Sequence, residues 1–408
     1  MPASSPSSND SPKRLREPET PDDPPLSGDS ASSGWKRASV LFVLTVLSVF
    51  ATAWTNSPAH EQAPLGREAL SQAAQFTGAL LAILVTHEFG HFIAAKLHGV
   101  PASPPFFIPL PLLSPFGTMG AIIRMSGRIP SRRALLDIGA SGPLAGLAVA
   151  IPMYLYGASH SRFVPLEGGE GVTLGESILL KLLDRIAMGA APAGMQLELG
   201  PVAFAAWGGL FVTMINLLPV GQLDGGHVAY SLFGRRQNEL ATFVHRSLLA
   251  LFFVNLSLFV LRDVRAGLGL MQLGTHISNS MFWLMWFTVL AVLASLATPA
   301  EPRQDGEPRV SNRQRLFGIF GLVALSSYGA HRRAEGLFWV AWFVGLGLLL
   351  AMERRGGSLR SARPTEPGLF DHPETVDATT ELGAGRKAVA VVTLLFFVLL
   401  FMPTPIVM

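Results

Sequence analysis

The stretch with the clearest chemistry is His87-Glu88-Phe89-Gly90-His91, a His-Glu-x-x-His sequence near the end of an apolar segment. On an α-helix, residues four apart lie on one face, so both imidazoles can hold one metal ion from the same side. Glu88 lies one position round the helix and points beside that ion, where a carboxylate can take a proton from an attacking water. The spacing therefore predicts a hydrolytic zinc site with His87 and His91 as ligands and Glu88 as the base.

The setting of this motif is an apolar run. Residues 76–97 are nearly all apolar outside the motif and Lys96, and the run is long enough to span a bilayer core. Ionisable side chains inside such a span are costly and by default mark a functional site. The alternative is a pair of core histidines that bond to neighbouring helices. A buried amphipathic helix of a soluble protein is disfavoured by the length of the run.

A second stretch, Asn216-Leu-Leu-Pro-Val-Gly-Gln-Leu-Asp-Gly-Gly-His227, offers a third ligand. Residues 199–223 carry no charge, and Asp224 follows them directly. A tetrahedral catalytic zinc needs a third protein ligand and one open position. Pro219 and the two glycines after Asp224 interrupt regular helix, which lets a short carboxylate turn inward. Irregular backbone at membrane depth is tolerated where it lines a cavity, so Asp224 is the candidate ligand.

Together these stretches resemble the site-2 protease family of intramembrane zinc metalloproteases. The resemblance rests on four segments in the family's order: HEFGH (87–91), FGTMGAIIRM (116–125), GASGPLAG (139–146) and NLLPVGQLDGG (216–226). It implies one Zn²⁺ per chain held by His87, His91 and Asp224, with Glu88 as catalytic base. It also implies that Asn216 helps to hold the scissile region. No PDZ-like domain lies between the motifs, so the likeness is to the compact members with extra transmembrane helices.

The segment 117–125 follows the HEFGH stretch and has the composition of a short strand. Two glycines in it allow close backbone approach. A substrate helix must be held extended before its backbone can be cut, which calls for strand-like contacts. We therefore expect a β-hairpin or small sheet beside the active site, with a substrate-binding strand formed by Gly117, Thr118, Met119, Gly120, Ala121 and Ile122.

Composition indicates a membrane protein. The chain has 408 residues, of which 49% are hydrophobic and 14% charged, against about 25% charged in soluble domains. The predicted fold is an all-α polytopic membrane protein with about eight transmembrane helices, namely 38–54, 73–97, 135–157, 201–219, 244–261, 278–298, 336–352 and 387–403. A formal net charge of +3 gives no support to nucleic-acid binding. The absence of cysteine limits zinc ligands to nitrogen and oxygen.

The chain divides into three predicted parts. Residues 1–36 read as a disordered cytoplasmic tail, because they are polar and lack apolar residues for a core. Residues 37–235 form the membrane protease core with the zinc site. Residues 236–408 supply further transmembrane helices and charged linkers. The Lys and Arg residues of the tail and of the segment 124–133 place both on the cytoplasmic side of a multi-pass cell-membrane protein.

Three smaller expectations follow from local pattern. Gly139, Gly142 and Gly146 lie three and four residues apart, so a neighbouring helix can approach closely. Residues 174–188 have apolar residues at helical spacing and suit an interfacial helix. His372 lies in a charged linker and is expected on the surface, whereas His227 is a candidate for contact with a zinc ligand.

Three functions compete. The first is hydrolysis of peptide bonds within or next to transmembrane segments of membrane-anchored proteins in the lipid bilayer, as in regulated intramembrane proteolysis. The second is a catalytically silent membrane scaffold or chaperone of the same fold, which would have no need of Glu88. The third is an ion-coupled transporter, which predicts internal repeats and polar residues spread through several spans; neither is evident. The sequence assigns no particular substrate and no oligomeric state.

Overall fold

The computed structural model describes residues 28–111, 114–125, 129–165, 173–269, 272–297, 344, 370, 372–373, 375–377 and 379–407. Its main helices are α1 (Gly28–Thr55), α2 (Pro58–Gln62), α3 (Arg67–Leu97), α4 (Arg132–Ser159), α5 (Ile178–Met188), α6 (Pro201–Asn216), α7 (Asp224–Phe233), α8 (Arg236–Arg265), α9 (Leu273–Ala297) and α12 (Ala384–Leu400). Its strands are β1 (Phe106–Pro109), β2 (Thr118–Ile122), β3 (Arg162–Pro165), β4 (Thr173–Leu174), β5 (Met195–Glu198) and β6 (Ile406–Val407).

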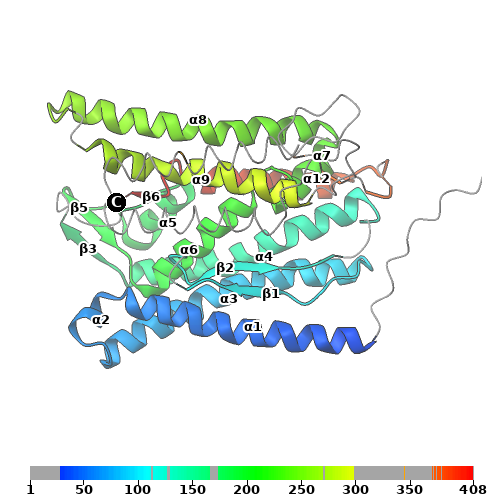
Figure 1. Ribbon diagram of the computed structural model, residues 1–408, viewed down its shortest axis with the longest axis horizontal. Helices are drawn as coiled ribbons and strands as arrows, with labels where there is room; N and C mark the ends of the chain where they lie inside the picture. Colours follow the sequence, from blue (N-terminus) through cyan, green and yellow to red (C-terminus); the bar gives the residue numbers. More distant parts are fainter. Residues whose placement is uncertain are drawn as a thin grey trace, which may run out of the picture.

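The protein is mostly helical, and its long helices run along the longest dimension of the molecule (Figure 1). Within the described residues, four helical stretches are long and apolar enough to cross a membrane, namely Gly34–Thr55, Arg67–Leu97, Arg132–Ser159 and Arg236–Arg265. They contain four of the spans expected from sequence. Helices α6, α9 and α12 lie at three other expected spans, and α6 is a shorter apolar helix. The expected span 336–352 lies outside the described residues.

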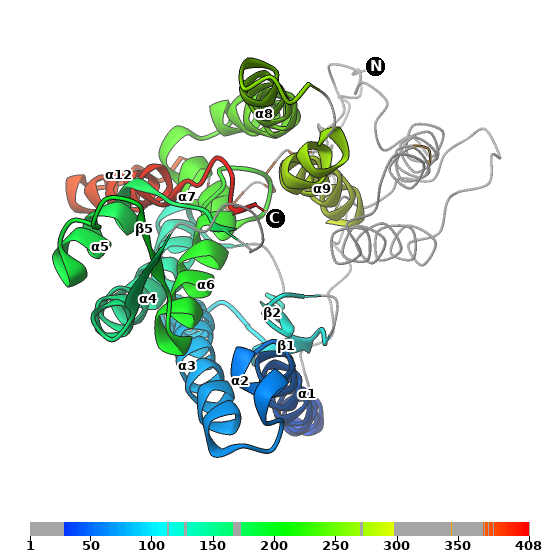
Figure 2. The same ribbon diagram turned by 90° about the vertical axis from the view of Figure 1, so that its left-hand side faces the viewer.

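The centre of the molecule is formed by α3, α4 and α6, with α1 on one side and α8 and α9 on the other (Figure 2). Glycines bring these helices together. A Cβ added to Gly90 of α3 would lie 2.7 Å from the Ser141 carbonyl oxygen of α4. A Cβ on Gly209 of α6 would lie 2.8 Å from the side chain of Ile83. Since lipid is as apolar as the side chains, such close backbone packing is a main source of helix association in membranes.

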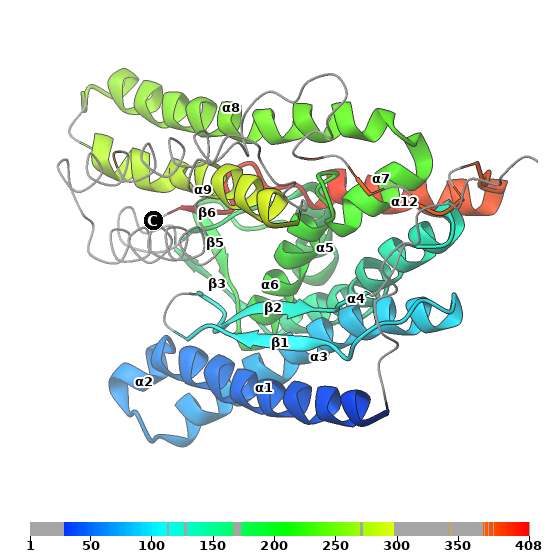
Figure 3. The ribbon, with the colours of Figure 1, turned by 45° about the vertical axis from the view of Figure 1, so that its right-hand side comes forward.

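Strands β1 and β2 form a two-stranded antiparallel hairpin, with Phe106 opposite Ile122. The hairpin packs against α1 and also touches α3 (Figure 3). Gly117, just before β2, has a φ of +73°, and a Cβ there would lie 2.7 Å from the Ser48 carbonyl oxygen of α1. The Ser48 hydroxyl donates a 2.6 Å hydrogen bond to the Gly117 carbonyl. Gly117 therefore lets the hairpin lie directly on α1.

The segment between α4 and α6 forms a smaller unit. Strands β3 and β5 pair antiparallel, and the expected helix at 174–188 is α5, which begins later, at Ile178. Ser177 precedes it, and its side chain accepts a hydrogen bond from the Leu180 amide, which is the usual way to start a helix. Close to this unit, β6 near the chain end pairs with β4. This pairing anchors the C-terminal end of α12, and at the beginning of α12 Arg386 forms a 2.7 Å ion pair with Asp137 of α4.

Candidate metal centre

Helix α3 presents the two histidines of the motif on one buried face. The Nε2 atoms of His87 and His91 lie 3.2 Å apart. Asp224, 137 residues beyond His87, places its Oδ2 atom 3.2 Å from Nε2 of His87 and 3.3 Å from Nε2 of His91. Within the described residues this is the one group of three metal-ligating side chains whose donor atoms converge, all within 4.8 Å of one another.

The triangle made by these three atoms has the size of one face of a zinc tetrahedron. Bonds of about 2.0–2.1 Å at tetrahedral angles place ligand atoms about 3.3–3.4 Å apart. The observed edges of 3.2, 3.2 and 3.3 Å match that spacing. Two imidazoles and a carboxylate are also a common ligand set for catalytic zinc, which leaves the fourth position open. The residues present therefore fit Zn²⁺.

The loop before α7 turns Asp224 toward α3. Helix α6 ends at Asn216, and Gly221 in the following loop has a φ of +53°. Asp224 is the first residue of α7. The two glycines after it let the loop fold back onto the start of the helix: a Cβ on Gly225 would lie 2.0 Å from the Leu217 carbonyl oxygen, and one on Gly226 would lie 2.2 Å from that of Gly221. The short glycine-rich turn thus positions the carboxylate.

Helix α4 covers the histidines with the predicted glycine stripe. A Cβ on Gly142 would lie 2.0 Å from Nε2 of His91, and one on Gly146 would lie 3.1 Å from Nδ1 of His87. A Cβ on Gly139 would lie 2.7 Å from the Cβ of His227. All three glycines therefore leave space for side chains of the site, which goes beyond the helix contact that their spacing predicted.

A backbone carbonyl fixes the orientation of His91. Nδ1 of His91 lies 2.7 Å from the carbonyl oxygen of Ile138. Because a carbonyl oxygen only accepts, Nδ1 carries the proton, and the lone pair of Nε2 faces the point on which the three ligand atoms converge. Bonds of this kind set the tautomer of metal-binding histidines and raise their basicity.

Two further predicted residues lie at the centre. Glu88 is buried next to the ligand pair on α3, with 9% of its surface exposed. The Nδ2 atom of Asn216 lies 3.3 Å from Nε2 of His87. Of the six residues predicted to bind substrate, Gly117 and Thr118 are buried and Met119 and Ile122 are exposed. The other two, Gly120 and Ala121, are half-buried.

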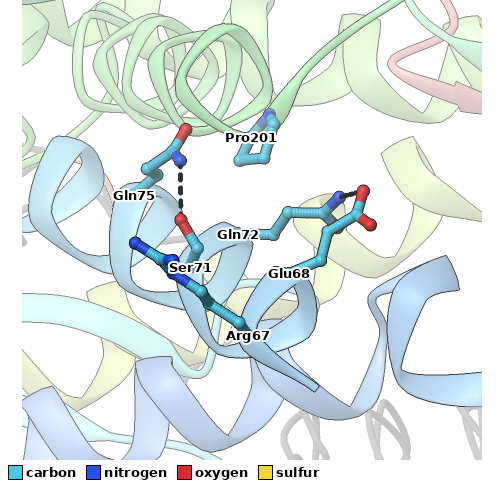
Figure 4. A pocket seen from close by; sticks show the side chains of 6 residues that line it. All are labelled: Arg67, Glu68, Ser71, Gln72, Gln75 and Pro201. Carbon is cyan, nitrogen blue, oxygen red and sulfur yellow. Dashed lines mark hydrogen bonds between the residues drawn. The ribbon is translucent and has the colours of Figure 1, made fainter. Parts of the chain in front are cut away.

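A hollow in the surface lies away from these residues. It has a volume of about 490 Å³ and is lined by Arg67, Glu68, Ser71, Gln72, Gln75 and Pro201 (Figure 4). It lies at the beginning of α3, and helical rise places it about 25 Å from the histidine motif near the other end. Its polar side chains bond mostly to one another, as in the 3.1 Å contact between Gln75 and Ser71. The hollow contains none of the converging ligands.

One expectation about the histidines is wrong. His372 is buried rather than exposed, because the segment around it packs across α7 and α8. Its Nε2 atom lies 2.7 Å from Nδ1 of His227, and its ring stacks on Tyr230. The sequence gives no sign of this contact, because it joins residues 145 apart. The charged residues of the linker instead indicate that His372 is exposed to solvent.

Residues 75–259, which contain all the converging ligands, match the model of peptidase family M50. The Arabidopsis thaliana protein "Probable zinc metalloprotease EGY2, chloroplastic" is 36% identical over 182 residues, which cover 43% of this chain and 32% of that protein. The Oryza sativa subsp. japonica protein "Probable zinc metalloprotease EGY1, chloroplastic" is 38% identical over 166 residues, which cover 38% of this chain and 27% of that protein.

The matches thus span about a third or less of these curated relatives. No solved structure matches the chain. The family match and the zinc metalloproteases agree with the resemblance drawn from the HEFGH and NLLPVGQLDGG stretches, and Zn²⁺ is the metal that they imply. Residues 75–259 thus carry the match to peptidase family M50, in agreement with the resemblance to the site-2 protease family.

Proposed function

We propose that this protein is a zinc-dependent intramembrane endopeptidase. The observation that supports this most strongly is the convergence of His87, His91 and Asp224, which brings three ligand atoms within 4.8 Å on helices of a membrane protein. Two of these ligands lie on α3, one of the helices long enough to cross a bilayer. Placing such groups at membrane depth is costly, and hydrolysis of a membrane-embedded bond explains their presence.

Each polar residue of the centre has a separate role in the proposal. His87, His91 and Asp224 hold the metal, which when bound supplies a Lewis acid and lowers the pKa of water to about 7. Glu88 takes the proton from the attacking water and returns it to the leaving amine. Asn216, beside His87, orients the scissile region by hydrogen bonding from its amide.

The proposed substrate is a membrane-anchored protein that is cut within or next to its transmembrane segment. Its helix has to unwind, since the carbonyls of a helix are bonded internally and the side chains shield the backbone. An extended segment in the bilayer then needs new partners for its N–H and C=O groups. We propose that β2, on which Met119 and Ile122 have exposed side chains, receives the extended substrate segment. The segment would add to β2 as a further strand next to the active site.

The finer topology is part of the same proposal. We infer about eight transmembrane helices, with the four long helices joined by α6, α9, α12 and the span 336–352. The parts 1–36, 37–235 and 236–408 serve as cytoplasmic tail, protease core and additional membrane helices. The charge pattern supports a multi-pass cell-membrane protein with a cytoplasmic N-terminus. The histidine pair on α3 and Asp224 on α7 then both lie towards the cytoplasmic leaflet, from which water can reach them.

The test compares the full-length wild type with Glu88→Gln in detergent and in liposomes. Glutamine keeps the size of the side chain but cannot accept the proton. We expect near-stoichiometric zinc in both proteins and a loss of cleavage of a model transmembrane substrate by at least about 100-fold in the variant. Wild type that binds zinc but cuts no substrate would favour the silent scaffold. Loss of zinc from Glu88→Gln would instead make Glu88 a ligand.

A further inference from the structure

The C-terminal segment that precedes α12 crosses the helix that carries Asp224. We call it the strap and define it as the described residues between 370 and 383. Phe370 packs against His245 of α8, with ring centroids 4.3 Å apart. The backbone amide of His372 donates a 3.2 Å hydrogen bond to Oδ1 of Asn238, also on α8. The strap lies more than 100 residues beyond the end of the matched family domain at residue 259.

The strap then reaches the start of α4. The amides of Val376 and Asp377 each donate a 3.0 Å hydrogen bond, to the carbonyls of Ile129 and Pro130 respectively. Asp377 forms a parallel bridge with Ser131, the residue that caps α4. Four of its side chains are buried, with exposed fractions of 6–7%, namely those of Phe370, His372, Thr375 and Leu382. The strap is thus built into the packing of α4, α7 and α8.

Helix α7 is short, packs against α4, α8 and α12, and is in addition fixed by side-chain contacts at its end and in its middle. At its end, the guanidinium of Arg132 from α4 donates hydrogen bonds of 2.6 and 3.1 Å to the Ser231 carbonyl, which satisfies an open carbonyl of the last turn. In its middle, His372 of the strap bonds to His227 and stacks on Tyr230, with ring centroids 4.4 Å apart. Asp224 lies one turn before His227, so a contact that fixes His227 also fixes the start of the helix.

The direction of the histidine bond follows from its neighbours. Nδ1 of His372 lies 2.7 Å from the Pro373 carbonyl oxygen, so Nδ1 carries a proton. Burial lowers the pKa of His372 to about 4, and the ring is neutral. Its Nε2 atom therefore accepts, and Nδ1 of His227 donates across the 2.7 Å contact. The strap sets the tautomer and the orientation of His227, whose Cβ lies against Gly139.

We propose that the strap is a fixed part of the catalytic site and that His372 is a positioning residue, which holds α7 and thereby Asp224 in place for zinc. The inference rests on the proposed function in that Asp224 is taken as a zinc ligand. It assigns a role in the site to a segment that lies outside the domain shared with the family.

The first test uses two substitutions of His372 in the full-length protein. His372→Phe keeps a ring on Tyr230 but removes the acceptor for His227, whereas His372→Gln offers an amide oxygen near the position of Nε2. We expect His372→Phe to release zinc to a chelator at least about tenfold faster than wild type, as when a partner of a metal site is lost. It should lower kcat with little change in KM, and His372→Gln should restore most of the zinc retention.

The matched control is His245→Phe, which also replaces a buried histidine in contact with the strap. His245 bonds to the Phe287 carbonyl and, among the residues that the structure describes, forms no hydrogen bond with α7, so zinc release should stay at the wild-type rate. Wild-type zinc release from His372→Phe would overturn the inference while leaving the proposed function intact. A wild type that binds no zinc would overturn the proposed function itself.

A cross-link tests the inference even if His372→Phe fails to fold. The chain has no cysteine, so the pair Ser131→Cys and Asp377→Cys can form a disulfide free of competing thiols. These bridge partners lie about 5 Å apart at Cα, within disulfide range. If the strap is fixed, the oxidised enzyme cleaves as fast as the reduced form. Loss of cleavage on oxidation, reversed by reductant, would show that the strap has to move and would contradict the inference.

Discussion

Adding one methyl group to helix α4 should empty the metal centre. The substitution Gly142→Ala places a Cβ 2.0 Å from Nε2 of His91, whereas ordinary contacts begin near 3.4 Å. The two groups must therefore separate by about 1.4 Å, which far exceeds the roughly 0.2 Å tolerance of metal–ligand distances. The ring cannot simply turn away, because its Nδ1–H is bonded to the Ile138 carbonyl and the helices are closely packed.

The expected size of the effect follows from this displacement. A misplacement of about 1 Å can lower an enzymatic rate by about 100-fold, or about 2.7 kcal/mol in the activation free energy. We expect Gly142→Ala to lose cleavage by at least that factor and to lose zinc, measured by elemental analysis of the purified protein. In Gly146→Ala the added Cβ would lie 3.1 Å from Nδ1 of His87, so a shift of only a few tenths of an ångström is needed. This variant should therefore lose less cleavage activity and less zinc than Gly142→Ala.

The matched control for both substitutions lies on α3 itself. Gly78 has no atom within 4 Å of an added Cβ, so Gly78→Ala should keep full zinc and activity. Its free energy of unfolding should also rise slightly, because alanine is a better helix former than glycine by up to about 1 kcal/mol. The loss of zinc and of cleavage should be largest in Gly142→Ala, smaller in Gly146→Ala and absent in Gly78→Ala. A full equivalent of zinc and wild-type cleavage in Gly142→Ala would refute the packing argument.

Three further predictions address the ligands and the substrate strand. Asp224→Ala should lose zinc while the protein still inserts, whereas His227→Ala should still bind zinc but, like His372→Phe, release it faster to a chelator; full zinc in Asp224→Ala together with loss of zinc in His227→Ala would make His227 the third ligand. Asn216→Ala should keep zinc and lose cleavage, and an unchanged cleavage rate would remove Asn216 from the site. Ile122→Pro removes a backbone N–H and should cut cleavage sharply at constant zinc, whereas Ile122→Val should be nearly silent; equal cleavage rates in the two would exclude strand addition at this position.

The three groups of the candidate metal centre could be singled out from the sequence, because short local patterns mark each of them. Helical geometry alone places His87 and His91 on one face. Asp224 stands out because it follows a long uncharged run and is surrounded by residues that break helices. The structure brings these three groups together. A strand at 118–122 could likewise be read from its composition, and it pairs with β1.

What sequence could not supply are contacts between distant segments. The spacing of the glycines in α4 indicated a helix partner, but not that Gly142 faces a ring nitrogen of His91. The burial of His372 depends on α7 and α8, which are more than 100 residues earlier in the chain. Asp377 and Glu381, two charged residues of the described part of the linker, are exposed as their charge indicates, but charge carries no information about one histidine that packs inward.

The closeness of α3 and α4 serves the chemistry as well as the packing. A hydrolytic site in a bilayer needs polar groups, and each of these needs a partner, since lipid offers none. Small residues on α4 bring its backbone within reach of the imidazoles, so that the Ile138 carbonyl can accept from His91 at 2.7 Å. The same absence of side chains leaves the Nε2 atoms free to face Asp224. A methyl group at Gly142 would occupy the space of the His91 ring and push it away from the Ile138 carbonyl and from Asp224, which explains why the glycines lie opposite the motif.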